Sequence, residues 1–396
     1  MKIGIIKPDY KISGGFEVVT NQLKNHLEKV GHQVEVKYID ATEEGTANIP
    51  TLIPNDIYIN NADFFNYVNY CWKYLNLDVS RFDRVISTQP PSFYVNHPNH
   101  ISLFYHHNKK YYDLSEIIQK CGQALAHHVK IADYIREMDS IALRKVKTIL
   151  AGSETIKKRI SQYNKISQNV DVIYAGIDSD IYNQSMNITY EKPIVVGRHE
   201  FPKRPELFVA ALHKGGIDGK VVGEGGRTED LKRIDQLVAY LLNEDKSVPD
   251  ELLWTKMSMG HFGEEYSVIL KRISKQPSVK RAIFTGRVSK QQLLMEYAQA
   301  LCVVCPAYEE DYGLTAIEAM SFKKPVIAFS DGGGYTELIK HGVTGFVINP
   351  SSDELARTLK LLVDNPAIAV EMGKNAYEFS RGFTWKNTTS KLLEYL

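Results

Sequence analysis

The sequence predicts an α/β protein built from two doubly wound parallel sheets in tandem. Short apolar runs that end in small, polar or histidine residues recur along the chain, and helix-like segments separate several of them. This rhythm restarts after a polar and poorly periodic stretch at residues 176–193. With 396 residues the chain has room for two such domains. Alternating β and α units predict parallel sheets with helices on both faces.

The first half opens with MKIGIIK, which reads as a buried strand. In GGFEVVTNQLKNHLEKVGH the apolar residues recur at steps of three and four, which predicts a helix that stops near Gly31. The same criteria predict five more strands in this half, at residues 33–39, 82–89, 100–107, 146–153 and 170–176.

The second half repeats the pattern in six further apolar runs. These runs predict strands at residues 193–198, 219–225, 281–287, 301–308, 324–330 and 344–350. Residues 226–280 are longer than a crossover needs and contain two helix-like stretches, so we expect an inserted helical segment to which the sequence assigns no task. We place the domain boundary between residues 180 and 181.

Composition argues against several classes of protein. The 48 basic and 47 acidic residues nearly balance, which gives no overall field for a nucleic acid. No window approaches the roughly 20 apolar residues that span a bilayer, and the first apolar run is too short for a signal peptide, so we expect a cytoplasmic protein. Cys302 and Cys305 have the spacing of a metal or redox pair, but they lie in a core strand and we expect buried hydrophobic side chains.

The stretch YEEDYGLTAIEAM at residues 308–320 carries the strongest chemical signal. A strand ends there and a helix begins near Leu314 or Thr315. Gly313 allows close approach to the first-turn amides of that helix, which form an anion site suited to a diphosphate. Glu310 precedes the turn and Glu318 lies about one turn inside the helix. Carboxylates accept hydrogen bonds from sugar hydroxyls well.

The alternative is that these acids only complement the helix N-terminus. We favour that alternative for Glu309 and Asp311.

Seven residues separate Glu310 from Glu318, and the segment KPVIAFSDGGGYTELIKHGVTGFV follows them. This pattern resembles the signature of family 4 retaining glycosyltransferases of the GT-B fold. The resemblance extends to Gly14 and Gly15, VIYAGIDSDIY, VGR with KRPE, TGRVSKQQLLMEYAQA and FTWKNTTSKLLEYL. It implies two Rossmann-like domains that face a cleft. An acceptor-binding domain would comprise residues 1–180 with a returning helix at 380–396, and a donor-binding domain would comprise residues 181–379.

The resemblance also implies a role for each matching donor-domain residue. Glu318 would hold the donor's ribose hydroxyls, and Glu310 would hold hydroxyls of the transferred sugar. The diphosphate would meet backbone amides at Gly313, Leu314 and Thr315 and the cations of Arg198 and Lys203. Val288 would contact the base through its backbone.

In the first domain, the turn at Gly14 and Gly15 would bring backbone amides to the donor phosphates. The segment HISLFYHHNKKYYD resembles the family segment that supplies an active-site histidine, for which His106 is the first choice and His107 the second. The choice between them stays open, because neighbouring strand residues point to opposite faces. Lys110 and Asp113 are candidates for lining the acceptor site.

The resemblance therefore implies a retaining transfer of a hexose-type sugar, and we expect it to need neither a metal nor a bound cofactor. The donor would be a UDP-, GDP- or ADP-linked sugar and the acceptor a glycan or a lipid-linked intermediate, in polysaccharide or glycoconjugate synthesis. A nucleotide-sugar epimerase on the same fold and a catalytically silent sugar-nucleotide-binding scaffold are the alternatives.

Three further patterns carry less weight. Asp178 and Asp180 resemble a metal-binding pair but lie in the expected linker, and GEGG at 223–226 lacks the third glycine of a dinucleotide fingerprint. Basic residues between 127 and 165 are consistent with a solvated face or with peripheral contact at the inner membrane surface.

Overall fold

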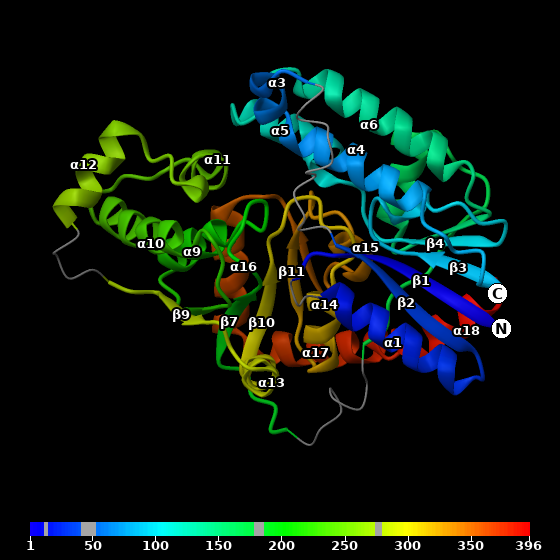
Figure 1. Cartoon of the computed structure of the whole chain (residues 1–396). Helices are drawn as coiled ribbons and strands as arrows, with labels where there is room; N and C mark the ends of the chain where they lie inside the picture. Colours follow the sequence, from blue (N-terminus) through cyan, green and yellow to red (C-terminus); the bar gives the residue numbers. More distant parts are fainter. Residues whose placement is uncertain (12–14, 41–52, 178–185, 274–278) are drawn as a thin grey trace. The chain divides into compact units, whose positions relative to one another are not determined.

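The chain folds into two compact units, which Figure 1 shows in sequence colours. The computed structural model describes residues 1–11, 15–40, 53–177, 186–273 and 279–396. Unit 1 comprises Met1–Gly176 with Phe383–Leu396, and unit 2 comprises Ile177–Gly382. Each unit contains a six-stranded sheet in which every neighbouring pair is parallel. The predicted α/β class and all of the predicted strand positions are confirmed.

The sheet of unit 1 has the strand order β2-β1-β3-β4-β5-β6. The order reverses between β1 and β3, because β2 lies on one side of β1 and all later strands lie on the other. The strands are β1 (Lys2–Asp9), β2 (Gln33–Asp40), β3 (Arg84–Ser87), β4 (His100–Phe104), β5 (Thr148–Ala151) and β6 (Val170–Val172).

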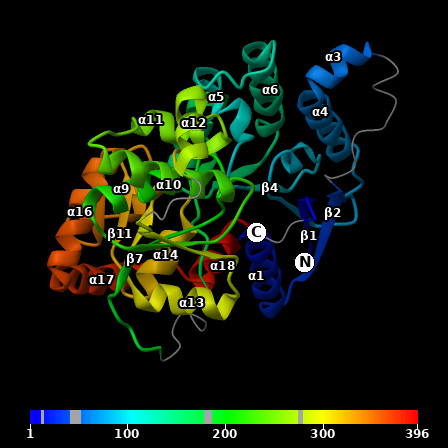
Figure 2. The same ribbon diagram turned by 90° about the vertical axis from the view of Figure 1, so that its left-hand side faces the viewer.

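The helices of unit 1 divide between the two faces of this sheet (Figure 2). α1 (Gly15–Lys29) packs against α18 (Trp385–Leu393), which comes from the far end of the chain. The connections from β2 to β3 and from β4 to β5 cross the sheet in the opposite direction to the β1–β2 connection, and they contain α4 (Ala62–Leu75) and α6 (His128–Leu143). Right-handed connections place these two helices on the opposite face of the sheet from α1. Shorter elements of the unit are α3 (Asn55–Asn60), η1 (Ser92–Tyr94), η2 (Lys109–Tyr111), α5 (Ser115–Lys120), α7 (Glu154–Arg159) and η3 (Ile160–Asn164).

The last helix is fastened to β6 and its following loop by polar contacts. The Thr388 hydroxyl donates to the Tyr174 carbonyl at 2.8 Å, and the Tyr395 hydroxyl donates to Asp171 Oδ2 at 3.0 Å. A Cβ on Gly176 would lie 2.2 Å from the backbone nitrogen of Trp385, so only glycine permits this approach. The C-terminal residues 383–396 therefore fold as part of unit 1.

The sheet of unit 2 has the order β12-β11-β10-β7-β8-β9, which is the Rossmann arrangement read from its opposite edge. The order reverses between β7 and β10. The strands are β7 (Lys192–Val196), β8 (Gly219–Val222), β9 (Ala282–Gly286), β10 (Ala300–Cys305), β11 (Val326–Phe329) and β12 (Gly345–Ile348).

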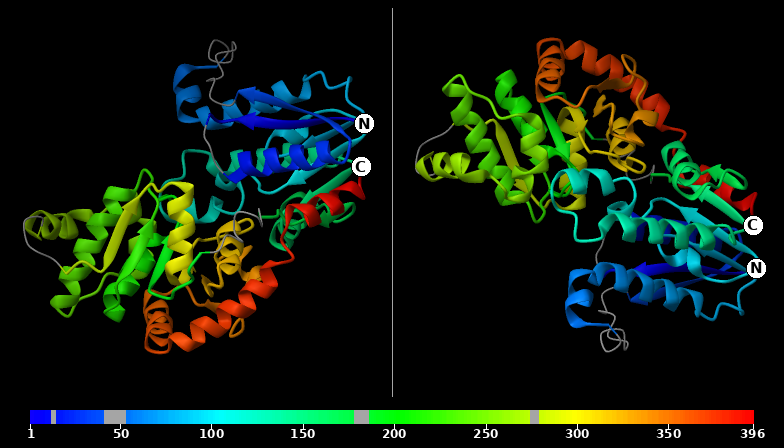
Figure 3. Two further views of the ribbon diagram at one scale, coloured as in Figure 1. Left: turned by 90° about the horizontal axis from the view of Figure 1, so that it is seen from below. Right: turned by 90° about the horizontal axis from the view of Figure 1, so that it is seen from above.

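Two groups of helices cover the sheet of unit 2, as the views in Figure 3 also show. α9 packs against α10 and α16, while α14 packs against α17. The bounds are α9 (Pro205–Gly215), α10 (Thr228–Asn243), α13 (Lys290–Gln299), α14 (Leu314–Ser321), α15 (Tyr335–Leu338), α16 (Ser352–Asp364) and α17 (Pro366–Ser380).

The long connection between β8 and β9 is helical, as expected. After α10 it contains α11 (Asp250–Thr255), η4 (Met257–Met259) and α12 (Gly263–Ile273). Leu253, Met257 and Phe262 join the same buried cluster as Leu207 and Phe208 of α9, so the insertion extends the core of the unit. Of the helices in the described ranges, none is long and apolar enough to cross a membrane.

Candidate functional site

The candidate residues of unit 2 follow the two strands between which the strand order reverses. β7 pairs with β10, so the loop that begins at Gly197 and the turn that begins at Pro306 start side by side at the carboxyl edge of the sheet. In open α/β sheets this crevice is the usual ligand site, because neighbouring crossovers leave it in opposite directions. Arg198 and Lys203 lie in the first loop, and Glu310 lies in the second.

The second loop leads into α14 through a glycine in the left-handed region. Gly313 is the N-cap with φ 103°, and a Cβ there would meet the Tyr335 ring at 2.5 Å. The helix begins at Leu314, as predicted, and Leu314 and Thr315 occupy its first turn, where backbone amides have no intrahelical acceptor. This turn therefore presents donors and the positive end of a helix dipole at the strand edge.

A run of three glycines after β11 is pressed against the Glu310 turn. A Cβ on Gly333, at φ 58°, would lie 2.3 Å from the Glu310 carbonyl oxygen, and one on Gly334 would lie 2.7 Å from that of Asp311. The Gly334 amide donates to the Glu310 carbonyl at 2.8 Å, and the Glu309 amide donates to the Asp331 carbonyl at 2.9 Å. The Tyr308 amide also donates to the Pro202 carbonyl at 3.0 Å. The Glu310 turn is therefore held by the loop after β7 and by the loop after β11.

The charged side chains of the site differ in how they are held. Lys203 Nζ lies 2.5 Å from Glu310 Oε2, and both side chains are only partly exposed. Glu318 Oε2 accepts a hydrogen bond of 2.8 Å from the Tyr297 hydroxyl on α13. The Arg198 side chain is 67% exposed and makes only a long contact of 3.4 Å to Glu200. The Arg198 guanidinium is therefore accessible to an anion from solution.

A narrow pocket with a free volume of about 20 Å³ lies between the two loops. Arg198 and Lys203 both line it, together with Tyr335 and the backbone that ends β10. His199 also lines it; its Nδ1 is 2.9 Å from the Thr228 hydroxyl. Within the described part of the chain its buried Nε2 has no hydrogen-bond partner. Burial lowers the pKa of His199, so its ring is neutral at pH 7.

Arg204 is an organising residue that the sequence analysis missed. Its side chain is buried, donates to the carbonyls of Pro306 at 2.7 Å and Ala307 at 3.2 Å, and pairs with Asp331 at 2.5 Å. The guanidinium also lies over the Trp254 ring at 5.1 Å. Arg204 therefore joins the loops after β7, β10 and β11. The local pattern KRPE contains two adjacent cations, and nothing in it distinguishes the buried one from the one that faces the cavity.

Val288 lies in the loop between β9 and α13 and is half-buried. β9 is two strands away from β7 in the sheet, so Val288 is farther from the crevice than the other candidates of this unit.

Unit 1 has a pocket with a free volume of about 500 Å³ at the carboxyl ends of β1, β3 and β4. Tyr10, Pro90 and Pro91 line it at the point where the strand order reverses, and His106 and His107 follow β4. His106 is half-buried, and its Nδ1 donates to the His107 carbonyl at 2.9 Å, which places the proton on Nδ1. In the neutral tautomer with this proton, Nε2 is the acceptor atom.

His107 has a different environment. Its ring is buried against Phe104 and Tyr112, with centroid separations of 4.8 Å and 4.2 Å, and its Nε2 lies 2.9 Å from Asn164 Oδ1. Burial lowers the pKa of His107 to about 3, so the ring stays neutral at physiological pH. These contacts favour a packing role for His107 and leave His106 as the histidine for chemistry.

Lys110 lines the pocket and pairs with Asp63 of α4. Asp113 does not line it, which corrects the expectation that it does. The Asp113 carboxyl is buried and is neutralised by Lys109 at 2.9 Å and Arg159 at 3.6 Å.

The glycine turn of unit 1 is only partly described. Gly14 lies outside the described residues, whereas Gly15 is the first residue of α1. The first turn of α1 is held by Lys7, a buried residue of β1 whose Nζ lies 2.6 Å from Glu17 Oε1. Asp178 and Asp180 of the linker also lie outside the described residues.

The cysteine pair is buried as predicted. Cys302 and Cys305 are free thiols in the buried strand β10, and burial raises the pKa of Cys302 to about 12. Neither thiol is therefore available as a thiolate near neutral pH.

Residues 260–379 match the family described as "Glycosyl transferases group 1". This segment contains β9 to α17 and therefore the whole Glu310 turn, α14 and the glycine run. Solved structures align over nearly the entire chain. The Anabaena protein Alr3699/HepE, solved with UDP and glucose, has a TM-score of 0.60 at 15% identity and covers 100% of this chain and 98% of its own. The chain has the GT-B glycosyltransferase fold.

A second GT-B structure is sucrose-phosphate synthase from Thermosynechococcus elongatus, which has a TM-score of 0.66 at 18% identity over 99% of this chain and 97% of its own. Among curated proteins, the lipopolysaccharide core mannosyltransferase LpcC of Rhizobium leguminosarum bv. viciae is 30% identical over 183 residues, which are 45% of this chain and 50% of LpcC. The chain spans about half the length of the curated relatives that it matches. The GT-B fold expected from the resemblance is thus confirmed for both units together.

Proposed function

We propose that the protein is a glycosyltransferase that moves a hexose-type sugar from a nucleoside diphosphate sugar to a glycan or lipid-linked acceptor. The observation that carries the proposal is the Glu310 turn. It places a carboxylate, a paired lysine and the N-terminus of α14 beside the crevice between β7 and β10. Each of these groups matches a different part of such a donor.

On the donor side, the diphosphate is assigned to the first-turn amides of α14 and to Arg198 and Lys203. Arg198 is largely exposed and lines the same cavity as Lys203, so two cations are available to one anion. Glu318 is assigned to the ribose. The Tyr297 hydroxyl occupies one carboxylate oxygen, and a carboxylate can accept further hydrogen bonds from a ribose diol.

Val288 is assigned to the nucleobase through its backbone, because it follows β9 at the same carboxyl edge of the sheet. This assignment rests on the family resemblance. The position of Val288, two strands from the crevice, is compatible with a base that extends away from the phosphates.

On the acceptor side, the pocket of unit 1 is assigned to the sugar hydroxyls. His106 Nε2 would accept a hydrogen bond from a hydroxyl, since its Nδ1 carries the ring proton. Gly14 and Gly15 are assigned to the donor phosphates, as expected from the resemblance.

The proposed chemistry retains the configuration at the anomeric carbon and uses no metal. The acceptor hydroxyl oxygen forms a bond to the anomeric carbon while the bond from that carbon to the diphosphate oxygen breaks. The hydroxyl proton passes to the departing diphosphate. Arg198, Lys203 and the amides of α14 stabilise the charge that grows on this leaving group, and the Glu310 carboxylate stabilises the positively charged sugar.

Envelope or capsule polysaccharide synthesis is the setting that we propose, because LpcC, a curated relative described above, is a mannosyltransferase of lipopolysaccharide core biosynthesis. UDP is the first base to test, because the Anabaena neighbour was solved with UDP and glucose. We propose a cytoplasmic location with peripheral contact at the inner membrane face.

The test is a calorimetric binding series with UDP, GDP and ADP, followed by mass spectrometry of products formed from the sugars of whichever nucleotide binds. Saturable binding of one nucleotide, followed by transfer or slow donor hydrolysis, supports the proposal. A product still attached to the nucleotide would instead identify an epimerase. Binding without turnover would identify a silent scaffold.

A further inference from the structure

Unit 1 has a second pocket, at the opposite edge of its sheet from His106. It has a free volume of about 260 Å³ and is lined by residues of α4, η1, α6 and the loop that precedes β4. His100, the first residue of β4, lies at its inner end, whereas His106 follows the last residue of that strand. The two pockets therefore open toward opposite ends of β4.

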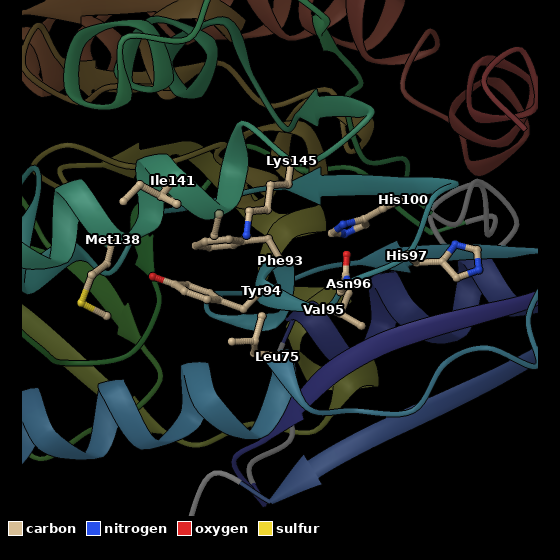
Figure 4. A pocket seen from close by; sticks show the side chains of 11 residues that line it. Leu75, Phe93, Tyr94, Val95, Asn96, His97, His100, Met138, Ile141 and Lys145 are labelled. Atoms are coloured by element: carbon tan, nitrogen blue, oxygen red, sulfur yellow. The ribbon is translucent and has the colours of Figure 1, made fainter.

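The connection between β3 and β4 explains why this pocket exists. A doubly wound sheet usually carries a helix on each crossover, but the β3–β4 crossover contains only η1 (Ser92–Tyr94). Both α4 and α6 contact η1, so the two helices flank a short turn where a third helix would otherwise fill the layer. A groove remains between them, and Figure 4 shows Leu75 on its α4 side and Met138 and Ile141 on its α6 side.

The lining is apolar at one end and polar at the other. In Figure 4 Phe93, Met138 and Ile141 lie on one side, His97 and His100 lie on the other, and the Lys145 side chain extends between them. The apolar members are Leu75, Phe93, Val95, Met138, Ile141 and Ala142. Leu75 is 44% exposed and Ile141 is 51% exposed, so large apolar side chains stand at the mouth as well as in the interior.

Lys145 is the positive charge of this lining, which contains no acidic residue. Among the described residues Lys145 forms no ion pair. The histidines do not add charge. His97 accepts from the Asn99 amide at 3.1 Å while its Nε2 lies 3.0 Å from the Phe82 carbonyl, and burial lowers the pKa of His100 to about 4. A ligand here would meet one cation beside a hydrocarbon surface.

We propose that this pocket binds the alkyl chain of an amphiphile whose anionic head pairs with Lys145. The lining is mostly apolar with a few placed polar groups, which is the usual character of small-molecule sites. The charge favours an anionic head over a neutral one, because a charge-assisted hydrogen bond to an anion is stronger than a hydrogen bond to a neutral acceptor. The site is separate from the sugar-transfer site.

The two pockets nonetheless share a wall. Tyr67 lines the His106 pocket, and Tyr94 lines the pocket proposed for the alkyl chain, called the alkyl pocket below. The hydroxyls of both residues donate to Asp139 Oδ1 at 2.9 Å. A ligand that moves Tyr94 would therefore act on the same carboxylate that positions Tyr67.

Binding of hexyl, octyl and decyl phosphate, each kept monomeric, tests the proposal by calorimetry. Each added methylene is expected to tighten binding about fourfold until the pocket is full. Octyl glucoside has the same chain with an uncharged head and is expected to bind at least about tenfold more weakly than octyl phosphate. Equal binding of the two would overturn the anionic head, and no binding of any alkyl phosphate would overturn the site.

Matched variants locate the site. Ile141→Glu and Lys145→Ala are each expected to weaken octyl phosphate binding at least about tenfold. Val129→Glu is the control for the first, because Val129 is on the same helix and 53% exposed but does not line the pocket. Lys147→Ala is the control for the second, as an exposed lysine outside the lining.

Unchanged binding in Ile141→Glu and Lys145→Ala would contradict the assignment. If the protein binds anionic vesicles but no monomeric alkyl phosphate, it contacts the membrane surface and the proposed pocket is wrong. Circular dichroism of each variant confirms that the fold is intact, so a loss of binding is read as a loss of the site.

Discussion

Lys203 Nζ lies 2.5 Å from Glu310 Oε2 and joins the loop after β7 to the turn after β10. The side chains are separated by 107 positions in the chain. We assign them to different parts of one donor, the lysine to the diphosphate and the glutamate to the sugar. Donor binding must then divide this ion pair, because the phosphates compete with Glu310 for the lysine. The pair holds both groups in place before the donor arrives.

Glu310→Gln is expected to lower kcat about 100-fold or more while leaving the thermal midpoint nearly unchanged, because an amide cannot stabilise positive charge on the sugar. Lys203→Met is expected mainly to weaken donor binding. Because the two side chains touch, the double variant should deviate from additivity by about 0.5–3 kcal/mol in transition-state energy. Steady-state kinetics of the two single variants and the double variant measure this coupling.

Glu309→Gln is the matched control, since it alters the adjacent acid, to which we assign no ligand. A similar loss of kcat in Glu309→Gln and Glu310→Gln would point to general disturbance of the turn. Full activity in Glu310→Gln would rule out the assigned role.

Gly333→Ala is expected to displace the Glu310 turn and weaken donor binding at least about tenfold, because the new Cβ would lie 2.3 Å from the Glu310 carbonyl oxygen. Gly342→Ala is the control. Gly342 also has a positive φ, of 75°, yet a Cβ there meets nothing within 4 Å. Both variants carry the same kind of backbone strain, about 1 kcal/mol, so only Gly333→Ala should change nucleotide affinity. Equal affinities in the two variants would contradict the packing argument.

The two adjacent histidines are expected to respond to substitution in opposite ways. His106→Ala should lower transfer at least about tenfold with little change in stability, since the ring lies at the pocket surface. His107→Ala should destabilise the protein by about 2–4 kcal/mol, because it leaves a cavity against Phe104 and Tyr112 and removes the partner of Asn164. Chemical denaturation and transfer rates of the two variants distinguish the roles. A stable and inactive His107→Ala would reverse the assignment.

Asp139 is expected to make the protein more stable at pH 5 than at pH 7.5. The hydroxyls of Tyr67, Tyr94 and Tyr112 donate to this carboxyl, and burial nevertheless raises its pKa to about 6. The unfolded value is about 3.9, so between these values the native state binds more protons than the unfolded state. Stability from this group is therefore present at low pH and is lost as the pH rises through 6.

Asp139→Asn removes this titration. When the pH rises from 5 to 7.5, the unsubstituted protein should lose about 1 kcal/mol more unfolding free energy than the variant loses. Asp133→Asn serves as the control, because Asp133 is on the same helix with its side chain 68% exposed. If Asp139→Asn and the unsubstituted protein have parallel pH profiles, Asp139 does not titrate in this range.

The sequence by itself determined the local structure and the chemical composition of the site. Each strand of both sheets could be predicted, because buried parallel strands are short apolar runs that neighbouring loops interrupt. The start of α14 could also be predicted, because glycine and the residues after it act within one turn. The candidates Arg198, Lys203 and Glu310 were visible as residue types in loops after strands, and Glu318 as an acid in the helix that follows.

Only the tertiary structure decided which of these residues meet and which side chains are buried. The order of strands in the two sheets depends on contacts between residues far apart in the chain, and this order makes β7 and β10 neighbours and joins Lys203 to Glu310. Arg204 and His107 are buried, whereas their sequence neighbours Lys203 and His106 are partly exposed. Side chains adjacent in sequence point in different directions, and only the packing around them decides which one is buried. The alkyl pocket follows from a crossover without a helix, which leaves a space that no single segment encodes.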